Sequence, residues 1–232
     1  MRSVLISDFG GVLTSPLQEG FLAYQEESGV SLEELGKAMG LAAGFLAYEQ
    51  EAPISLEDLG RGMQAAAEIY GAHPLHSLER GEITEADFRD RIEPHLENGF
   101  DLARLRALYF ERMDSNRDMI EFIRDLRGRG VRAALLTNNV REWEPLWRAK
   151  LPQLDELFEL VVDSAFVGLR KPDPAIYSLT LERLGGVSPE RCVFVDDLDV
   201  NCDAARALGM AAVRFETAEQ AIPEIESALA RE

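Results

Sequence analysis

Polar side chains follow the short apolar runs of this sequence, at the points where buried strands would end. They are Asp8 after VLIS, Thr137 at the end of AALLT, Lys171 in GLRKPDP, and Asp196 and Asp197 after CVFV. Short runs rich in Val, Ile and Leu are typical of parallel strands that are buried on both faces. The carboxyl ends of such strands meet at one edge of an open α/β sheet, where ligands bind. Carboxylates and an ammonium group gathered there could attack and neutralise an anionic substrate.

The three aspartates of this set would repel one another if they met without positive charge between them. A hard divalent cation held by oxygen ligands relieves that repulsion, and Mg²⁺ also bridges to phosphate oxygens. The sequence therefore predicts a magnesium site formed by Asp8, Asp196 and Asp197.

A phosphate group could be held at the same edge by backbone amides and polar side chains. The amides of Phe9 and Gly10 follow the first strand in a glycine-rich turn that can cradle an anion. Thr137 and Asn138 stand at the start of a helix, where a hydroxyl, an amide and backbone N–H groups can bind a phosphate oxygen. An ordinary helix cap is the alternative for this pair.

Lys171 is notable because lysine is scarce in this chain. Lys37, Lys150 and Lys171 are its only lysines, although arginines are numerous. The prolines that follow Lys171 stiffen its loop and would aim its ammonium group at a bound anion. Arg170, its neighbour, is expected to be a surface charge.

Composition excludes several classes of function. The net charge is -18 and the pI about 4.6, so we expect no nucleic-acid partner. No basic segment followed by an apolar stretch begins the sequence, and no run approaches the ~18 apolar residues of a membrane span. We therefore expect a cytoplasmic protein without a membrane partner. Cys192 and Cys202 are expected to be reduced and packed near the sheet.

From residue 116 onward the sequence alternates between helical and strand patterns. That alternation predicts an α/β fold whose core is a doubly wound, Rossmann-like parallel sheet. The predicted elements are helices 116–129, 141–149, 174–184, 201–208 and 217–230, and strands 132–137, 159–163, 192–196 and 211–215.

The stretch 16–97 has helical patterns and no strand pattern. Ser15 and Pro16 fit an N-cap followed by Pro at the first helical position. We therefore predict a core domain of residues 1–15 and 98–232, interrupted by an inserted all-helical cap domain of residues 16–97.

The predicted cap contains an internal repeat. Residues 20–40 align without gaps on residues 44–64, with twelve of twenty-one positions identical. Each copy predicts a helix, a turn at Gly29 or Pro53, and a second, capped helix. Two copies are too few for a solenoid, so we interpret the repeat as a local duplication that enlarged the cap. Capping-box spacing occurs at Ser31 and Glu34, Ser55 and Asp58, and Thr84 and Asp87.

Taken in order, the four polar segments resemble the haloacid dehalogenase superfamily of phosphatases, dehalogenases and mutases. The family pattern is an Asp nucleophile in DxD, then Thr or Ser, then Lys, then an acidic pair, and the resemblance covers the whole predicted core. Where most of the phosphatases carry the second Asp, this chain has Gly10. Its DxGGV segment is similar to that of a branch with sugar-phosphatase-like proteins and relatives of the N-terminal phosphatase domain of soluble epoxide hydrolases.

The resemblance implies catalytic roles for Asp8 and Lys171. Asp8 would attack phosphorus and form an aspartyl-phosphate, which splits one difficult displacement into two easier steps. Lys171 would neutralise the phosphate and hold the nucleophile.

The resemblance also implies a ligand set for Mg²⁺. The carboxylate of Asp8 and the backbone carbonyl of Gly10 would bind the ion. Asp197 is favoured as a further direct ligand, and Asp196 as one that acts through water or from outside the ligand shell. Asn201, which completes DDxxxN, would orient this loop.

Gly10 removes the family's usual general acid and base, a loss typically worth ~10²–10⁴ in rate. Three explanations stay open. Water or a cap side chain donates the proton, the leaving group needs little help, as in an anomeric or acyl phosphate, or the protein has lost catalysis. His76 and Glu82 are the first cap candidates, although a structural role is favoured for His76.

The sequence thus predicts a Mg²⁺-dependent hydrolase, a phosphatase that acts on a small phosphomonoester through Asp8. One alternative is a non-catalytic protein that binds a phosphorylated metabolite. Another is a dehalogenase, in which the Asp attacks carbon. That branch has an aromatic residue at the position of Gly10 and lacks the paired metal ligands, so Asp196 and Asp197 disfavour it.

Overall fold

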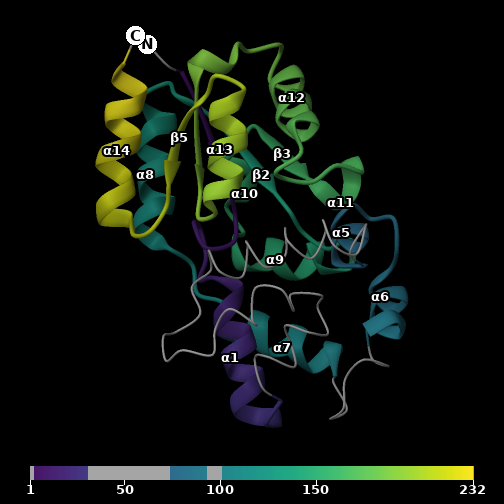
Figure 1. Cartoon of the computed structure of the whole chain (residues 1–232). Coiled ribbons are helices and arrows are strands. Elements are labelled where there is room, and N and C mark those ends of the chain that lie inside the picture. Colours follow the sequence, from purple (N-terminus) through teal and green to yellow (C-terminus); the bar gives the residue numbers. More distant parts are fainter. Residues whose placement is uncertain (1–2, 31–73, 93–100, 232) are drawn as a thin grey trace, which may run out of the picture.

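A five-stranded parallel sheet forms the centre of the computed structural model, which describes residues 3–30, 74–92 and 101–231 (Figure 1). Its strands are β1 (Val4–Ser7), β2 (Arg132–Thr137), β3 (Leu160–Asp163), β4 (Cys192–Asp196) and β5 (Ala211–Arg214). Their order across the sheet is β3, β2, β1, β4, β5. β1 therefore lies in the middle, and its carboxyl end stands beside the carboxyl end of β4.

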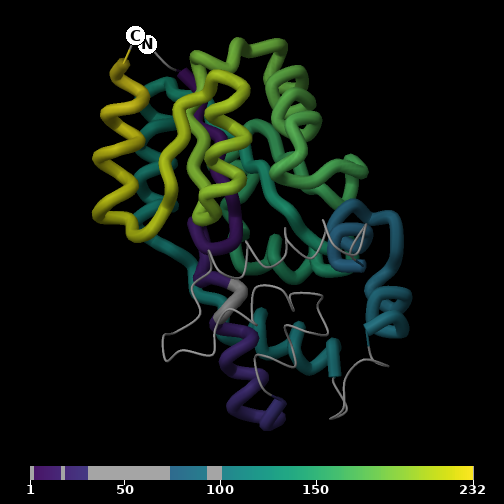
Figure 2. The backbone as a smooth tube through the Cα atoms, in the orientation of Figure 1, coloured from purple at the N-terminus to yellow at the C-terminus, as the bar shows by residue number. Residues whose placement is uncertain are grey.

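Helices cover both faces of this sheet (Figure 2). They are α8 (Arg117–Gly128) and α14 (Ala218–Ala230) on one face, and α12 (Pro174–Arg183) and α13 (Asp199–Ala207) on the other. Successive strand residues point to opposite faces. Leu5 accordingly packs in the cluster that contains α8, whereas Val4 and Ile6 pack in the cluster that contains α12. This two-sided burial explains the continuous apolar runs and confirms the predicted doubly wound sheet.

The predicted strands begin and end within one residue of the observed ones, and the five predicted core helices are present. The other described helices are α1 (Leu17–Ser28), α5 (Pro74–Glu79), α6 (Glu85–Ile92), α7 (Leu102–Arg112), α9 (Glu144–Lys150), α10 (Leu154–Leu157), α11 (Ser164–Val167), and the short 3₁₀ helices η3 (Arg141–Trp143) and η4 (Pro189–Arg191). Of these, α7, α10 and α11 were not predicted.

α7 is the longest of the omitted helices, and the sequence does carry signals for it. Asp101 caps its N-terminus by accepting a hydrogen bond from Arg104 N at 3.0 Å. Leu102, Leu105 and Leu108 recur at helical spacing and are buried. An N-cap followed by this apolar period is typical of an amphipathic helix.

α1, α5, α6 and α7 share a second hydrophobic cluster, separate from those of the sheet. Phe21 and Tyr24 of α1 belong to it together with Leu105 and Leu108 of α7. Figure 1 shows α1 and α7 side by side beyond the carboxyl edge of the sheet. A helical unit thus follows β1, and α7, which lies after the predicted cap, packs with it. The division into a core domain and a cap of residues 16–97 stays a prediction.

The chain enters and leaves this helical unit through two adjacent segments. Thr14 and Ser115 form an isolated antiparallel bridge. The Ser15 hydroxyl accepts a hydrogen bond from Asp114 N at 3.0 Å, and Ser15 N donates to the Asp114 carbonyl at 2.8 Å. The predicted helix cap at Ser15 is therefore wrong, because its side chain serves this pairing. The N-cap of α1 is Pro16, which supplies no side-chain hydrogen bond.

The repeat is described only as far as Val30. α1 is followed by Gly29 in the left-handed conformation, with φ 75°, where the turn of the first copy is predicted. The rest of the first copy and all of residues 44–64 lie outside the described residues, as do the capping boxes that begin at Ser31 and Ser55.

The capping box predicted at Thr84 is confirmed. Asp87 N donates to Thr84 Oγ1 at 3.1 Å, and Thr84 N donates to Asp87 Oδ2 at 2.9 Å. This reciprocal pair satisfies two backbone N–H groups at the start of α6.

Cys192 in β4 and Cys202 in α13 are buried, and neither forms a disulfide. Both pack in the cluster on the α12 side of the sheet. The prediction that both cysteines pack near the sheet is confirmed.

None of the helices in the described part of the chain combines the length and the apolar composition that crossing a membrane requires.

Candidate functional site

Three carboxylates meet at the carboxyl edge of the sheet. Asp8 follows β1, Asp196 ends β4 and Asp197 comes next, and these two strands are neighbours. One carboxylate oxygen from each residue lies within 4.8 Å of the others. Asp8 and Asp196 are buried, and Asp197 is half-buried. The sheet thus brings together the acidic residues that the sequence places at strand ends.

Lys171 pairs with two of these carboxylates. Its Nζ lies 2.8 Å from Asp8 Oδ1 and 2.6 Å from Asp196 Oδ2. The Lys171 side chain is only 1% exposed, so solvent and salt screen these ion pairs little. A buried ammonium group requires such partners, because without either carboxylate its charge would be uncompensated.

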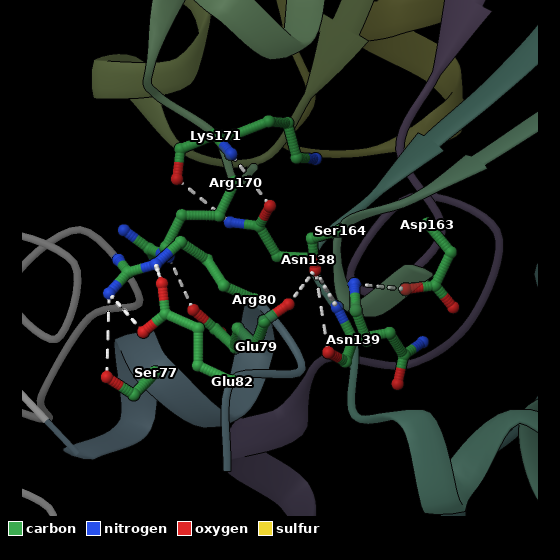
Figure 3. Close-up of polar contacts among 11 residues, drawn as sticks. Ser77, Glu79, Arg80, Glu82, Asn138, Asn139, Asp163, Ser164, Arg170 and Lys171 are labelled. Carbon is green, nitrogen blue, oxygen red and sulfur yellow. Dashed lines mark hydrogen bonds and ion pairs between the residues drawn. The ribbon is translucent and has the colours of Figure 1, made fainter. Parts of the chain in front are cut away.

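Asn138 holds the main chain of Lys171 (Figure 3). Asn138 Oδ1 accepts a hydrogen bond from Lys171 N at 2.8 Å, and Asn138 Nδ2 donates to the Lys171 carbonyl at 3.0 Å. Two bonds from one amide fix the backbone from which the lysine side chain starts. The Asn138 side chain therefore positions the backbone of Lys171. A contact between Asn138 and phosphate stays a prediction.

Asp196 is engaged through both of its oxygens. Oδ2 pairs with Lys171, while Oδ1 accepts hydrogen bonds from Asn201 Nδ2 and Leu198 N, each at 2.9 Å. Asn201 is itself buried. These bonds fix the loop after β4 and leave Asp196 poorly suited to bind a cation directly, which agrees with the role outside the ligand shell that the resemblance implies.

Burial and mutual repulsion disfavour the charged forms of these aspartates. Burial raises the pKa of Asp8 from 3.8 to about 6; Lys171 opposes this shift, and the charge of Asp196 adds to it. Burial, with the charges of Asp196 and Asp8, raises the pKa of Asp197 well above its usual range. Burial alone would lower the pKa of Lys171, but Asp196 and Asp8 outweigh it and raise that pKa. The single ammonium group does not balance three carboxylates.

This donor set fits a hard divalent cation. Carboxylate oxygens are the ligands that Mg²⁺ prefers. Burial, and after it neighbouring negative charge, raises the pKa values of Asp8 and Asp197, so a further positive charge at this point would stabilise their ionised forms.

Gly11 allows the turn after Asp8 to approach Asp197 closely. Its φ is 74°, in the left-handed region that favours glycine. A Cβ atom on Gly11 would overlap Asp197 Oδ2, at a distance that real Cβ atoms essentially never show. The position of the Asp197 carboxylate therefore depends on Gly11.

We expect Gly11→Ala to displace the Asp197 carboxylate and to strain the backbone by about 1–2 kcal/mol. The variant should melt at a lower temperature than the parent and should gain less stability from added Mg²⁺. Gly10→Ala is the matched control, because Gly10 is outside the left-handed region and a Cβ there meets no described atom closer than 4.0 Å. Equal melting behaviour of the two variants, with and without Mg²⁺, would contradict this account of Gly11.

The turn that carries the expected phosphate-binding amides is anchored by Phe9. The Phe9 ring packs against Trp147 with centroids 5.2 Å apart, and the Phe9 carbonyl accepts a hydrogen bond from Leu13 N at 2.9 Å. Thr137 ends β2 at the same edge of the sheet and is buried. The contacts of these groups with phosphate stay predictions.

The side-chain position that Gly10 leaves open faces a tyrosine. A Cβ atom on Gly10 would lie 4.0 Å from Tyr109 Oη of α7. Burial, together with the charges of Asp8 and Asp197, raises the pKa of Tyr109, so its hydroxyl stays protonated. Tyr109 was not among the predicted site residues, because α7 was not among the predicted helices. The capping Asp101 and the apolar period would have located the helix, but not the residue that its tyrosine faces.

The C-terminal end of α5 is attached to the core beside the Lys171 loop (Figure 3). The Ser164 hydroxyl donates to the Glu79 carbonyl at 2.6 Å and accepts a hydrogen bond from Asn139 N at 3.0 Å. Arg170 Nε donates to Glu79 Oε2 at 2.6 Å, and the two side chains are only 16% and 13% exposed. The prediction that Arg170 is a surface charge is therefore wrong, because the arginine is largely buried and pairs with Glu79 of α5.

The two residues of the predicted cap that were considered as proton donors have different surroundings. Glu82 pairs with Arg80 at 2.6 Å, and hydrogen bonds, chiefly from Arg80, lower the pKa of Glu82. A glutamate held in its ionised form is poorly suited to donate a proton. His76 is buried within α5. Catalytic roles for both residues stay predictions.

A cavity of about 520 Å³ opens beside the carboxylate cluster, on the side of the two connecting segments. Its lining includes Gly11, Ser15, Asp114 and Asp197. This cavity gives a small ion or water a route to the Asp197 side of the site.

The chain matches one protein-family model along most of its length: residues 3–209 match the haloacid dehalogenase-like hydrolases. It is 35% identical over 111 residues to acyl-CoA dehydrogenase family member 10 of Mus musculus, a match that covers 48% of this chain and 10% of that protein. It is 36% identical over 101 residues to the glyceraldehyde 3-phosphate phosphatase of Methanopyrus kandleri, which covers 42% of each. The chain thus spans less than half the length of both relatives.

Solved structures share the fold. A haloacid dehalogenase family enzyme of Bacteroides thetaiotaomicron superposes with a TM-score of 0.65 at 21% identity, over 93% of this chain and 94% of that one. The same enzyme in complex with magnesium and inorganic phosphate superposes with a TM-score of 0.60, also at 21% identity, over 93% and 95% of the two chains.

Proposed function

The chain belongs to the haloacid dehalogenase-like hydrolases, and on that premise we propose that it is a Mg²⁺-dependent phosphatase acting on small phosphomonoesters through an aspartyl-phosphate on Asp8. The observation that carries the proposal is the buried pairing of Asp8 with Lys171 beside Asp196 and Asp197. A nucleophile next to a fixed ammonium group and a cation-binding donor set suits a phosphate ester. The name of the Methanopyrus kandleri relative supports a small phosphorylated substrate.

Asp8 carries both half reactions. In the first, an Asp8 oxygen bonds to phosphorus as the bond from phosphorus to the leaving oxygen breaks. In the second, water attacks phosphorus, the bond to Asp8 breaks, and inorganic phosphate leaves. Lys171 Nζ, 2.8 Å from Asp8 Oδ1, neutralises negative charge throughout. Because Asn138 fixes its backbone, the lysine needs little rearrangement between the steps.

Asp8, Asp197 and the backbone carbonyl of Gly10 are the groups that would hold Mg²⁺, with Asp196 acting through water. When bound, the ion neutralises charge on the transferring phosphoryl group. The engagement of both Asp196 oxygens by Lys171, Leu198 and the buried Asn201 supports this division of roles. The Bacteroides thetaiotaomicron enzyme of the same fold forms a complex with magnesium and inorganic phosphate, which supports a magnesium site on this fold.

A panel of sugar, nucleotide, acyl and aryl phosphates, assayed with Mg²⁺, tests the proposal. We expect phosphate release from members with good leaving groups and none when EDTA removes the metal. If no member is hydrolysed although Mg²⁺ raises the melting temperature, the phosphatase proposal fails and the alternative is a non-catalytic protein that binds a phosphorylated metabolite. The dehalogenase alternative predicts that halide is released without any metal. The acidic pair Asp196 and Asp197 disfavours this alternative, because it suits a site that binds a cation.

We expect Mg²⁺ to raise the melting temperature, and to do so more at about pH 8 than at about pH 5, because ligands must lose their protons to bind metal. The raised pKa of Asp8 stabilises the metal-free protein below pH 3.8, and this contribution is lost as pH rises through about 6. Mg²⁺ should reverse that loss. At ~100 times its dissociation constant it would add roughly 2.7 kcal/mol.

Thermal melts at both pH values with Mg²⁺ or EDTA measure this effect. Asp197→Asn should lose most of the response to Mg²⁺. Asp203→Asn is the matched control, since Asp203 is exposed and pairs with Arg206 at 2.7 Å, within α13. A melting temperature that millimolar Mg²⁺ leaves unchanged would show that the acidic cluster binds no metal.

A further inference from the structure

The Tyr109 hydroxyl lies where a side chain on residue 10 would extend. A Cβ atom on Gly10 would be 4.0 Å from Tyr109 Oη, and apart from the chain neighbours of Gly10 no other described atom comes that close. The Gly10 backbone is outside the left-handed region, so it does not require glycine. The hydroxyl makes no hydrogen bond to the described residues. It is therefore a polar group, on a buried ring, that faces the site without a partner among those residues.

Helix packing fixes the direction of this tyrosine. A Cβ atom on Gly20 of α1 would lie 2.8 Å from Tyr109 Cβ and 2.9 Å from its Cα, so α1 can approach α7 here only because residue 20 lacks a side chain. The Tyr109 ring packs against Phe110 and Trp143, with centroids 5.0 and 6.2 Å away. The residue is 8% exposed. These contacts hold the ring firmly and aim its hydroxyl toward Gly10.

α7 is also on the side from which a leaving group would extend. In phosphoryl transfer the attacking and leaving oxygens are roughly in line on opposite sides of phosphorus. Asp8 stands at the carboxyl edge of the sheet, and Figure 1 shows α7 beyond that edge. A leaving oxygen directed away from Asp8 therefore points toward the helical unit that carries Tyr109.

We propose that Tyr109 is a catalytic residue that donates a hydrogen bond to the leaving-group oxygen, in the space that Gly10 leaves open. The inference rests on the proposed phosphatase function. As Asp8 bonds to phosphorus, the bond to the leaving oxygen breaks and both electrons of that bond stay on the oxygen. The Tyr109 O–H group stabilises the developing anion and keeps its own proton. The released alkoxide then takes a proton from water.

The benefit of this hydrogen bond should grow with the basicity of the leaving oxygen, because more charge develops there. A hydrogen bond to a charged group is worth roughly ten- to hundredfold in rate, which is less than full proton transfer can give. The parent protein should therefore turn over aryl and acyl phosphates better than alkyl phosphates of similar size. Tyr109→Phe should make this dependence steeper.

Single-turnover rates of Tyr109→Phe, measured with aryl phosphates of graded leaving-group basicity and with an alkyl phosphate, test the proposal. The loss should be smallest for 4-nitrophenyl phosphate and should rise to roughly ten- to hundredfold for the alkyl phosphate. Tyr24→Phe is the matched control. It also removes a buried tyrosine hydroxyl from the helical unit, one that accepts a hydrogen bond from Asp101 N at 2.8 Å. Its loss of rate relative to the parent should be the same for every leaving group.

A double-mutant cycle adds a second criterion. If Tyr109 substitutes for the missing acid, Gly10→Asp should remove most of the loss that Tyr109→Phe causes, so the two effects should not add. Additive effects, or an equal loss with every substrate, would overturn the role of Tyr109 and leave the phosphatase proposal intact. If the parent turns over no member of the series, both proposals fail.

Discussion

Replacing Asp8 with Asn is expected to abolish phosphate release while leaving the fold intact. An amide has nearly the shape of a carboxylate but is not a competent nucleophile, so we expect a loss of at least ~10²-fold. The oxygen of the introduced amide can still accept a hydrogen bond from Lys171, which also keeps its ion pair with Asp196 at 2.6 Å. The exchange removes a buried charge that its surroundings disfavour, as the raised pKa of Asp8 shows.

Phosphate release in single turnover and thermal melts measure the two parts of this prediction. Asp203→Asn makes the same chemical change on the exposed face of α13 and should keep parental activity. Mass spectrometry of the acid-quenched parent should detect one added phosphoryl group, which Asp8→Asn should lack. Turnover of Asp8→Asn within about tenfold of the parent would exclude the covalent mechanism.

Gly10→Asp is expected to increase the hydrolysis of alkyl phosphates. A positioned carboxylic acid contributes ~10²–10⁴ in rate, and we expect the lower end because Tyr109 already donates a hydrogen bond. The structure tolerates the change, since the Gly10 backbone is outside the left-handed region and a Cβ meets only Tyr109 Oη among the described atoms, at 4.0 Å. The backbone carbonyl of residue 10, a proposed metal ligand, is retained.

Gly10→Asn is the control for this gain, because it has the same shape without a transferable proton. Rates should rise with Asp only, and chiefly for basic leaving groups. The gain should follow the protonation of the new carboxyl, so a pH profile of the single-turnover rate would identify it. If Gly10→Asp folds, binds Mg²⁺ and is no faster than Gly10→Asn, residue 10 does not limit proton donation.

Local sequence determined much of this fold. The strands β2 and β4 occupy the predicted residues because apolar runs buried on both faces are continuous in the sequence. Parallel strands that are neighbours end at one edge, so residues just after β1 and at the end of β4 had to meet. The gathering of Asp8, Asp196 and Asp197 therefore follows from strand positions and from the rule that ligands bind at that edge.

Only the tertiary structure decided what surrounds these residues. Arg170 is paired with Glu79 and Asn138 holds the backbone of Lys171, and both contacts join segments that are distant in the sequence. Tyr109 faces Gly10 because two helices approach closely at Gly20. Periodicity reports which residues of an element are buried, but not which residue of another element they contact. The sequence by itself therefore determined the strands and the acidic cluster. That Tyr109 faces Gly10, where the usual acid is missing, depends instead on helix packing between segments that are distant in the chain.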